Sequence, residues 1–257
     1  MSNLTLRILS GVVLISVALA AVVLGGIPFW LLCVVLGVLM MGEWADLQKA
    51  PPQTKRLAQY ALSVPLAIMM PMIGAGAGFL TLGLLVGAAF FVVIVTRLPG
   101  LARGIFYVGL PIMALLVIRR QQEGVVFALW ALALVWACDI GAYAAGRLIG
   151  GPKIAPGISP NKTWAGLIGG MVAASLFAAF MHLEYGLPLR LTLATPLLAV
   201  LAQMGDFYES WLKRQAGVKD SGTLLPGHGG VLDRLDGLVP VAPVAALLIL
   251  LPKVYWW

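Results

Sequence analysis

Charged side chains are scarce in this sequence. Only 11% of its 257 residues are Asp, Glu, Lys or Arg, whereas 61% are hydrophobic. Soluble domains carry charge on about a quarter of their residues, so the composition excludes an ordinary soluble domain. It indicates a polytopic membrane protein with little or no soluble part.

Cysteine and histidine are also rare. The two cysteines, Cys33 and Cys138, both lie inside apolar runs. We predict that they are small core residues rather than a disulfide or a metal-binding pair. The two histidines, His182 and His228, fall on opposite sides of the predicted membrane, so the sequence indicates no His/Cys metal site.

The usual nucleotide-binding motifs are absent as well. The sequence contains neither a G-x-x-x-x-G-K-[ST] phosphate loop nor the Gly-rich fingerprint of a Rossmann fold. A nucleotide, if the protein binds one, must therefore be held by other groups.

Long apolar runs fill most of the chain. A membrane-spanning helix needs about 20 mostly apolar residues, and nine runs are candidates. They are 7–24, 27–45, 57–73, 77–96, 101–118, 124–147, 163–182, 188–210 and 237–252. The predicted fold is therefore all-α, a polytopic integral membrane protein with about nine transmembrane helices.

The distribution of Lys and Arg predicts how these helices are oriented. With nine spans, the N-terminus and the even-numbered loops share one side of the membrane with 13 of the 17 Lys and Arg residues. By the positive-inside rule this side is cytoplasmic, and the C-terminus lies outside. The polar loops 148–162 and 211–236 then both face the cytoplasm.

One segment breaks the general avoidance of charge. Residues 206–236 hold nine charged side chains, a third of those in the chain. Charge at a membrane edge is costly unless it is paired or binds something, so this density predicts chemistry rather than solubility. The acids are Asp206, Glu209, Asp220, Asp233 and Asp236, and the cations are Lys213, Arg214, Lys219 and Arg234.

Asp206 stands at the end of the eighth apolar run. If that helix continues to Gly217, a natural helix terminator, then Asp206, Glu209, Ser210 and Lys213 share one helix face. Two interpretations remain open for Asp206: an ion pair with Lys213 or the adjacent Arg, or a ligand of a bound ion.

Two further acids, Asp233 and Asp236, lie just before the ninth run. Asp236 could simply cap that helix. Asp233 could instead pair with Asp206 across two helix ends. Mg²⁺ prefers oxygen ligands and keeps water and substrate phosphates in its shell, so few carboxylates beside several cations suggest a metal-phosphate site.

The sequence PGHGG at 226–230 supplies flexible backbone between these charged groups. Its glycines would let N–H groups close on an anion, and His228 could orient a phosphate or a carboxylate. The alternative is a plain turn.

A second group of polar residues surrounds the loop 148–162. Asp139, Tyr143 and Arg147 follow one another at four-residue spacing on the sixth predicted helix. An acid inside a membrane span is a candidate functional residue, although Asp139 could serve only as a structural partner. Ser159 and Lys162 precede the seventh helix, where they could cap it or hold a phosphate.

The segment Ser210–Asp236 resembles the complete signature of the phosphatidate cytidylyltransferases, also called CDP-diacylglycerol synthases, without a mismatch. The likeness covers about the last 120 residues, including 203–209, 139–143 and 159–170. The chain departs from the family pattern at Ile140, Asn161 and Ala165. These departures concern secondary substrate contacts.

The resemblance implies that CTP and phosphatidic acid react, with Mg²⁺, to give CDP-diacylglycerol and pyrophosphate at the cytoplasmic edge of the cell (inner) membrane. Besides these substrates we expect membrane lipids as partners, a homodimer as one assembly, and no nucleic acid. Residues 1–120 would be a helical scaffold that could mediate dimerisation, and 121–257 the catalytic region.

The resulting prediction for the site has three parts. The predicted catalytic residues are Asp206, Lys219, Asp220, Asp233 and Arg234. The predicted metal ligands are Asp206, Asp233 and Asp236. The predicted substrate contacts are Asp139, Tyr143, Ser159, Lys162, Lys213, Arg214, Ser221, His228, Gly229 and Gly230.

Three other functions compete with this one. A CDP-alcohol phosphatidyltransferase would need a D-G-x₂-A-R motif, which is absent. A CTP-dependent polyprenol or dolichol kinase would transfer the γ-phosphoryl group instead. An ion-coupled transporter would use Asp139 and Asp206 as coupling acids, but it predicts an inverted repeat, and none is evident.

Overall fold

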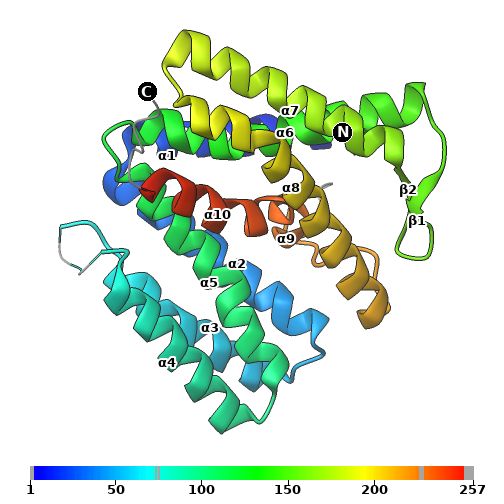
Figure 1. Ribbon diagram of the computed structural model, residues 1–257. Helices are drawn as coiled ribbons and strands as arrows, with labels where there is room; N and C mark the ends of the chain where they lie inside the picture. The colour runs from blue at the N-terminus through cyan, green and yellow to red at the C-terminus, as the bar shows by residue number, and fades with distance from the viewer. Residues whose placement is uncertain (1–2, 73, 75, 226–228, 252–257) are drawn as a thin grey trace.

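Helices make up most of the protein (Figure 1). The computed structural model describes residues 3–72, 74, 76–225 and 229–251, with side chains from residue 9 onward. The helices are α1 (Asn3–Leu24), α2 (Gly26–Leu47), α3 (Pro52–Ile68), α4 (Phe79–Thr96), α5 (Pro99–Arg119), α6 (Gly124–Leu148), α7 (Trp164–Tyr185), α8 (Leu189–Ala216), α9 (Leu232–Leu235) and α10 (Leu238–Leu250). Each of the nine predicted runs forms a helix, and α9 is a short addition.

Six of these helices, α2 and α4 to α8, are long and apolar enough to cross a membrane. Shorter apolar helical segments lie at Leu9–Leu24 and Leu238–Leu250. With 13 residues, α10 is about 20 Å long, which is shorter than a bilayer core of about 30 Å. The prediction of an all-α polytopic membrane protein is confirmed.

Helices α6 and α7 pack against each other along their length, as Figure 1 shows. A methyl group at Gly141 of α6 would come within 2.6 Å of the Gly169 carbonyl oxygen of α7. Glycine at position 141 therefore permits this close approach of the two helices.

The predicted polar loop between α6 and α7 contains a small hairpin. Strand β1 (Lys153–Ala155) pairs antiparallel with β2 (Ser159–Thr163). Thr163 then caps α7, because its hydroxyl accepts a hydrogen bond from the Gly166 N–H at 3.0 Å. This cap places Lys162 at the start of α7.

Helix α8 extends beyond its apolar part, as predicted. It ends at Ala216, and Gly217 follows with φ 78°, in the left-handed region that glycine adopts without strain. The last turns of α8 therefore present their polar residues beside α9.

Two arginines at the opposite end of the molecule bind helix ends. Arg119 donates to the Val22 and Val23 carbonyls of α1, and Arg190 donates to the carbonyls of Ile249 and Leu251 at the end of α10. Carbonyls in the last turn lack partners within the helix, so a structural role explains these cations.

Candidate active site

The two polar loops meet at one end of the helix bundle. Lys162, on the hairpin, forms an ion pair with Asp206 of α8. The same ammonium lies 4.3 Å from the centre of the Phe207 ring. The structure therefore brings together two groups that are more than 40 residues apart in the sequence.

Asp206 keeps part of its surface open. Ser210 donates to its Oδ1 at 3.3 Å, one helical turn further along α8. Even with these contacts, 35% of the Asp206 side chain is exposed. A carboxylate that is held in place but not enclosed can still bind a ligand.

Lys213 bridges two acids on its buried side. Its Nζ lies 2.7 Å from Glu209 Oε2 and 2.6 Å from Asp233 Oδ1. The Glu209 side chain is completely buried, and the Asp233 side chain is 6% exposed. The helix face predicted for Asp206, Glu209, Ser210 and Lys213 is thus confirmed by the Asp206–Ser210 and Glu209–Lys213 contacts.

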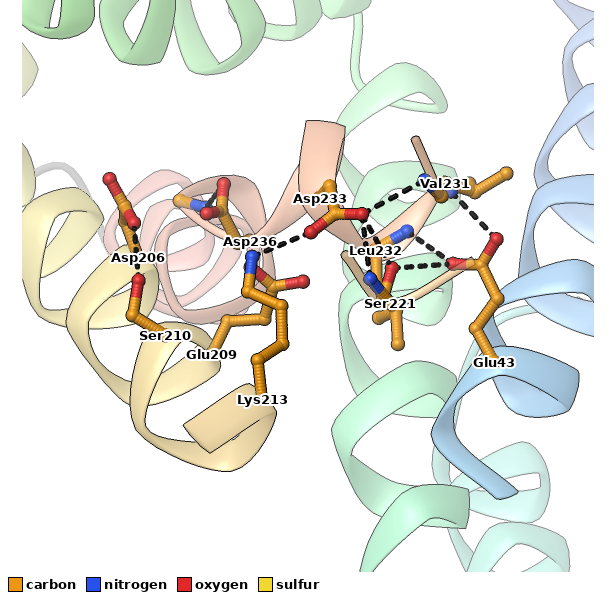
Figure 2. Close-up of polar contacts among 12 residues, drawn as sticks. Glu43, Asp206, Glu209, Ser210, Lys213, Ser221, Val231, Leu232, Asp233 and Asp236 are labelled. Carbon is orange, nitrogen blue, oxygen red and sulfur yellow. Dashed lines mark hydrogen bonds and ion pairs between the residues drawn. The ribbon is translucent and has the colours of Figure 1, made fainter. Parts of the chain in front are cut away.

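Asp233 also organises the charged loop (Figure 2). Its Oδ2 accepts hydrogen bonds from the Ser221 N–H at 2.8 Å, the Ser221 hydroxyl at 3.0 Å and the Gly230 N–H at 2.9 Å. Burial alone would raise the pKa of Asp233, but the hydrogen bonds from Lys213, Gly230 and Ser221 lower it below its usual range. Asp233 is therefore a firmly ionised anchor on which the loop closes.

Asp236 lies between Asp206 and Asp233 in Figure 2. The N-cap of α10 is Gly237, and no side chain caps that helix, so the simple capping interpretation of Asp236 is wrong. Burial, together with the charges of Asp206 and Glu209, raises the pKa of Asp236 to about 8. Burial, more than the neighbouring acids, therefore favours the protonated form of Asp236.

Glu43 of α2 is a member of the site that the sequence analysis missed. It is 3% exposed, it accepts hydrogen bonds from the N–H groups of Val231 and Leu232, and its Oε2 lies 3.1 Å from the Ser221 hydroxyl oxygen. A signal was present, since Glu43 is an acid inside an apolar run.

The three residues of the second predicted group do not act as one unit. Arg147 donates to the Tyr143 hydroxyl at 2.7 Å, and both side chains are exposed. Asp139 instead interacts electrostatically with Asp206, Lys162 and Arg234. Of this group, Asp139 is the one that the fold directs toward the charged site.

The remaining predicted site residues lie on or near the two loops. Gly229 has φ 84°, and its carbonyl accepts a hydrogen bond from the Leu225 N–H at 2.9 Å. Ser159 pairs with Ala155 in the hairpin. The exposed members are Arg214, Lys219, Asp220 and Arg234. His228 lies outside the described residues.

The carboxylates fit a metal that takes few protein ligands. Within the described part of the chain, no three His, Cys, Asp or Glu side chains are grouped so that they alone could hold an ion. Yet Glu209 Oε1 is buried without a hydrogen-bond partner, and burial, with the charges of Asp206 and Glu209, raises the pKa of Asp236. Mg²⁺ suits such a site because water and phosphates complete its shell.

The apolar helices and the cluster of acids and cations at their edge define an integral membrane protein whose site suits phosphate groups. The chain matches the cytidylyltransferase family over residues 5–251, and it belongs to that family.

Several relatives carry the name phosphatidate cytidylyltransferase. One from Brucella suis is 41% identical in an alignment of 259 positions that covers 96% of this chain and 93% of the relative. One from Bacillus subtilis is 33% identical in an alignment of 271 positions that covers 98% of this chain and 99% of the relative. One from Rickettsia typhi is 29% identical in an alignment of 251 positions that covers 94% of this chain and 90% of the relative.

Proposed function

We propose that this protein is a phosphatidate cytidylyltransferase, an enzyme that converts phosphatidic acid and CTP to CDP-diacylglycerol and pyrophosphate. The observation that carries the proposal is the convergence of Lys162, Asp206, Lys213 and Asp233 at one edge of an apolar helix bundle. The family match over residues 5–251 and the names of the relatives support it.

The chemistry needs no nucleophile from the protein. An oxygen of the lipid phosphate attacks the α-phosphorus of CTP, and a new P–O bond forms. The bond from the α-phosphorus to the oxygen that bridges it to the β-phosphorus breaks, and pyrophosphate leaves. Such transfers depend on positioning and on electrostatic stabilisation of the phosphates, which clustered Lys, Arg and loop residues can supply.

Mg²⁺ is part of the proposal. Asp206, which is partly exposed, and Asp236, whose pKa is raised, would hold the ion. Asp233 remains the third predicted ligand, although Lys213 and the loop occupy its oxygens in this structure. When bound, Mg²⁺ would neutralise phosphate charge as it develops in the transition state.

The remaining residues are assigned by their exposure. Lys219, Arg214 and Arg234 lie on the accessible side of the loop, where they can bind the triphosphate of CTP. Asp139 lies on α6, and Lys162 lies just before α7. A lipid phosphate can enter between the helices on this side of the site. The site is proposed to face the cytoplasm, in agreement with the excess of Lys and Arg on that side.

Labelled CTP tests this function. With α-³²P-CTP, Mg²⁺ and phosphatidic acid, we expect label in the lipid and release of unlabelled pyrophosphate. With γ-³²P-CTP, the lipid should stay unlabelled. Label from γ-³²P-CTP in a lipid would instead identify a lipid kinase, and no lipid labelling in either case would refute the transferase function. A labelled protein that passes its label to the lipid would contradict direct attack.

A further inference from the structure

Glu43 comes from the first half of the chain, yet it is buried among residues of the charged loop. It lies on α2, 178 positions before Ser221. We propose that Glu43 is a positioning residue for the transfer reaction: it clamps the loop that carries Ser221, Val231 and Leu232 against α2 and so fixes Asp233. This inference rests on the proposed function.

The geometry of the clamp is specific. Glu43 Oε1 accepts from the Val231 N–H at 2.8 Å, and Oε2 accepts from the Leu232 N–H at 2.8 Å. Both oxygens thus bind backbone donors that immediately precede Asp233. A carboxylate satisfies this pair of donors in a way that a side chain with one acceptor atom cannot.

Ser221 links the clamp to the candidate catalytic groups. Its hydroxyl lies 3.1 Å from Glu43 Oε2 and 3.0 Å from Asp233 Oδ2. Asp233 in turn binds Lys213. A continuous chain of contacts therefore runs from α2 to the ion pair on α8, and Figure 2 shows the order of these side chains.

Two glycines of the loop make room for the clamp. A methyl group at Gly222 would lie 2.7 Å from Glu43 Oε1, and one at Gly230 would lie 2.6 Å from Oε2. Larger residues at these positions would push the carboxylate away from its donors. The loop is thus shaped around the Glu43 carboxylate as well as around Asp233.

The test replaces Glu43 with Gln, which keeps the length and polarity of the side chain. Because each Glu43 oxygen accepts from a backbone N–H, either orientation of the amide sets its NH₂ group against an N–H donor. We expect E43Q to lower kcat by roughly tenfold to 10²-fold, the effect of a misplaced reacting group. The KM for CTP should stay within about threefold, since the exposed cations that bind CTP are untouched.

Asp46→Asn is the matched control. Asp46 is an acid three residues further along α2, but it is exposed and pairs with Lys55 outside the site. It should keep the wild-type kcat. If wild type and D46N both fail to label lipid, the proposed function fails, and that failure is distinct from the failure of the clamp.

A double-mutant cycle separates positioning from mere stability. Asp233→Asn and E43Q should be strongly non-additive in kcat per mole of monodisperse protein, because both act through the same loop. Additive effects, or a kcat for E43Q within about twofold of wild type, would overturn the proposal.

Glu43→Asp covers the case in which E43Q does not fold. It keeps the charge but is one methylene shorter, so a reduced kcat with an unchanged KM would support the clamp. A wild-type kcat for E43D would overturn it. Recovery of neither variant as monodisperse protein would assign Glu43 to fold stability and would also overturn it.

Discussion

Asp206 and Asp233, taken as single residues, differ in what their carboxylates can still bind. Asp206 has 35% of its side chain exposed, whereas Asp233 has 6% and is bonded on both oxygens. Both are buried or half-buried acids next to Lys residues, yet one is open toward a ligand and the other anchors a loop. The same residue type thus stands in two different environments, one partly open and one enclosed.

Replacing either acid with Asn should lower turnover by about 10²-fold or more, the usual cost of losing one stabilising group in the transition state. D206N should raise the Mg²⁺ concentration needed for half-maximal activity. The double variant should be little worse than either single one, because residues that act as a unit are non-additive.

Activity per mole of monodisperse protein, measured across a Mg²⁺ titration, checks this prediction. If the acids were only structural, less folded protein would be recovered, but the surviving molecules would have nearly normal specific activity. Near-normal turnover for D206N or D233N would remove that residue from the site.

Asp236 predicts a pH dependence of stability in the absence of Mg²⁺. Its pKa rises from 3.8 to about 8 on folding, so the folded protein favours the protonated form. The contribution of Asp236 to stability is full below the unfolded pKa and is lost as the pH rises from about 4 toward 8.

D236N should therefore flatten the decline of Tm over this pH range, while the exposed control D46N should not. Added Mg²⁺ should raise the Tm of the wild type more at the alkaline end, where Asp236 is ionised. Melting curves of the detergent-solubilised protein measure both effects, and parallel curves for wild type and D236N would contradict the assignment.

Among the helices and strands, the apolar runs were sufficient to predict every long helix. Periodicity also placed Asp206 and Ser210 on one face, because residues four apart are neighbours on any α-helix. It could not predict the hairpin β1–β2, whose short strands carry no alternating pattern. Nor could it predict the contact of Glu43 with Val231, since pairing across 188 positions is set by tertiary packing.

The close packing of α6 and α7 leads to a stability prediction. A methyl group at Gly141 would meet the Gly169 backbone, which cannot move aside as a flexible side chain can. Gly141→Ala should therefore destabilise the protein by about 1–3 kcal/mol through overpacking. It should also lower activity, because a shift of α7 would displace Lys162, which directly precedes that helix and pairs with Asp206.

Gly87→Ala on α4 is the control, because a methyl group there would meet nothing within 4 Å. Alanine is the better helix former, so this change should leave Tm unchanged or slightly raised. Thermal unfolding of both variants compares them directly. Equal Tm values would show that α6 and α7 can move apart without loss of stability.

In the whole molecule, the first and second halves of the chain share one site. Helix α5 is the most enclosed of the six long apolar helices, because 61% of its apolar 18-residue stretch is buried. It packs against α2, α4 and α10. The Glu43 contacts then join α2 to the charged loop. The division into a scaffold at 1–120 and a catalytic region at 121–257 stays a prediction, but the scaffold contributes a buried acid to the loop.

The orientation of this bundle can be tested with single cysteines. Cys33 and Cys138 are 2% and 0% exposed, so they should resist a membrane-impermeant maleimide in the folded protein. Thr223→Cys in the charged loop after α8 and Glu184→Cys in the last turn of α7, before α8 begins, add exposed thiols at the two ends of α8.

The side of the membrane with 13 of the 17 Lys and Arg residues is predicted to be cytoplasmic. In intact cells, the maleimide should therefore label E184C and a cysteine added after Trp257, but not T223C. Permeabilised cells should show labelling at all three positions, which controls for reactivity. Because the two ends of α8 must face opposite sides if α8 spans the bilayer, equal labelling of T223C and E184C in intact cells would contradict the nine-span arrangement. Labelling of T223C alone would indicate the inverted orientation of the bundle. The proposed CTP site would then lie on the outer face of the membrane, without access to cytoplasmic CTP.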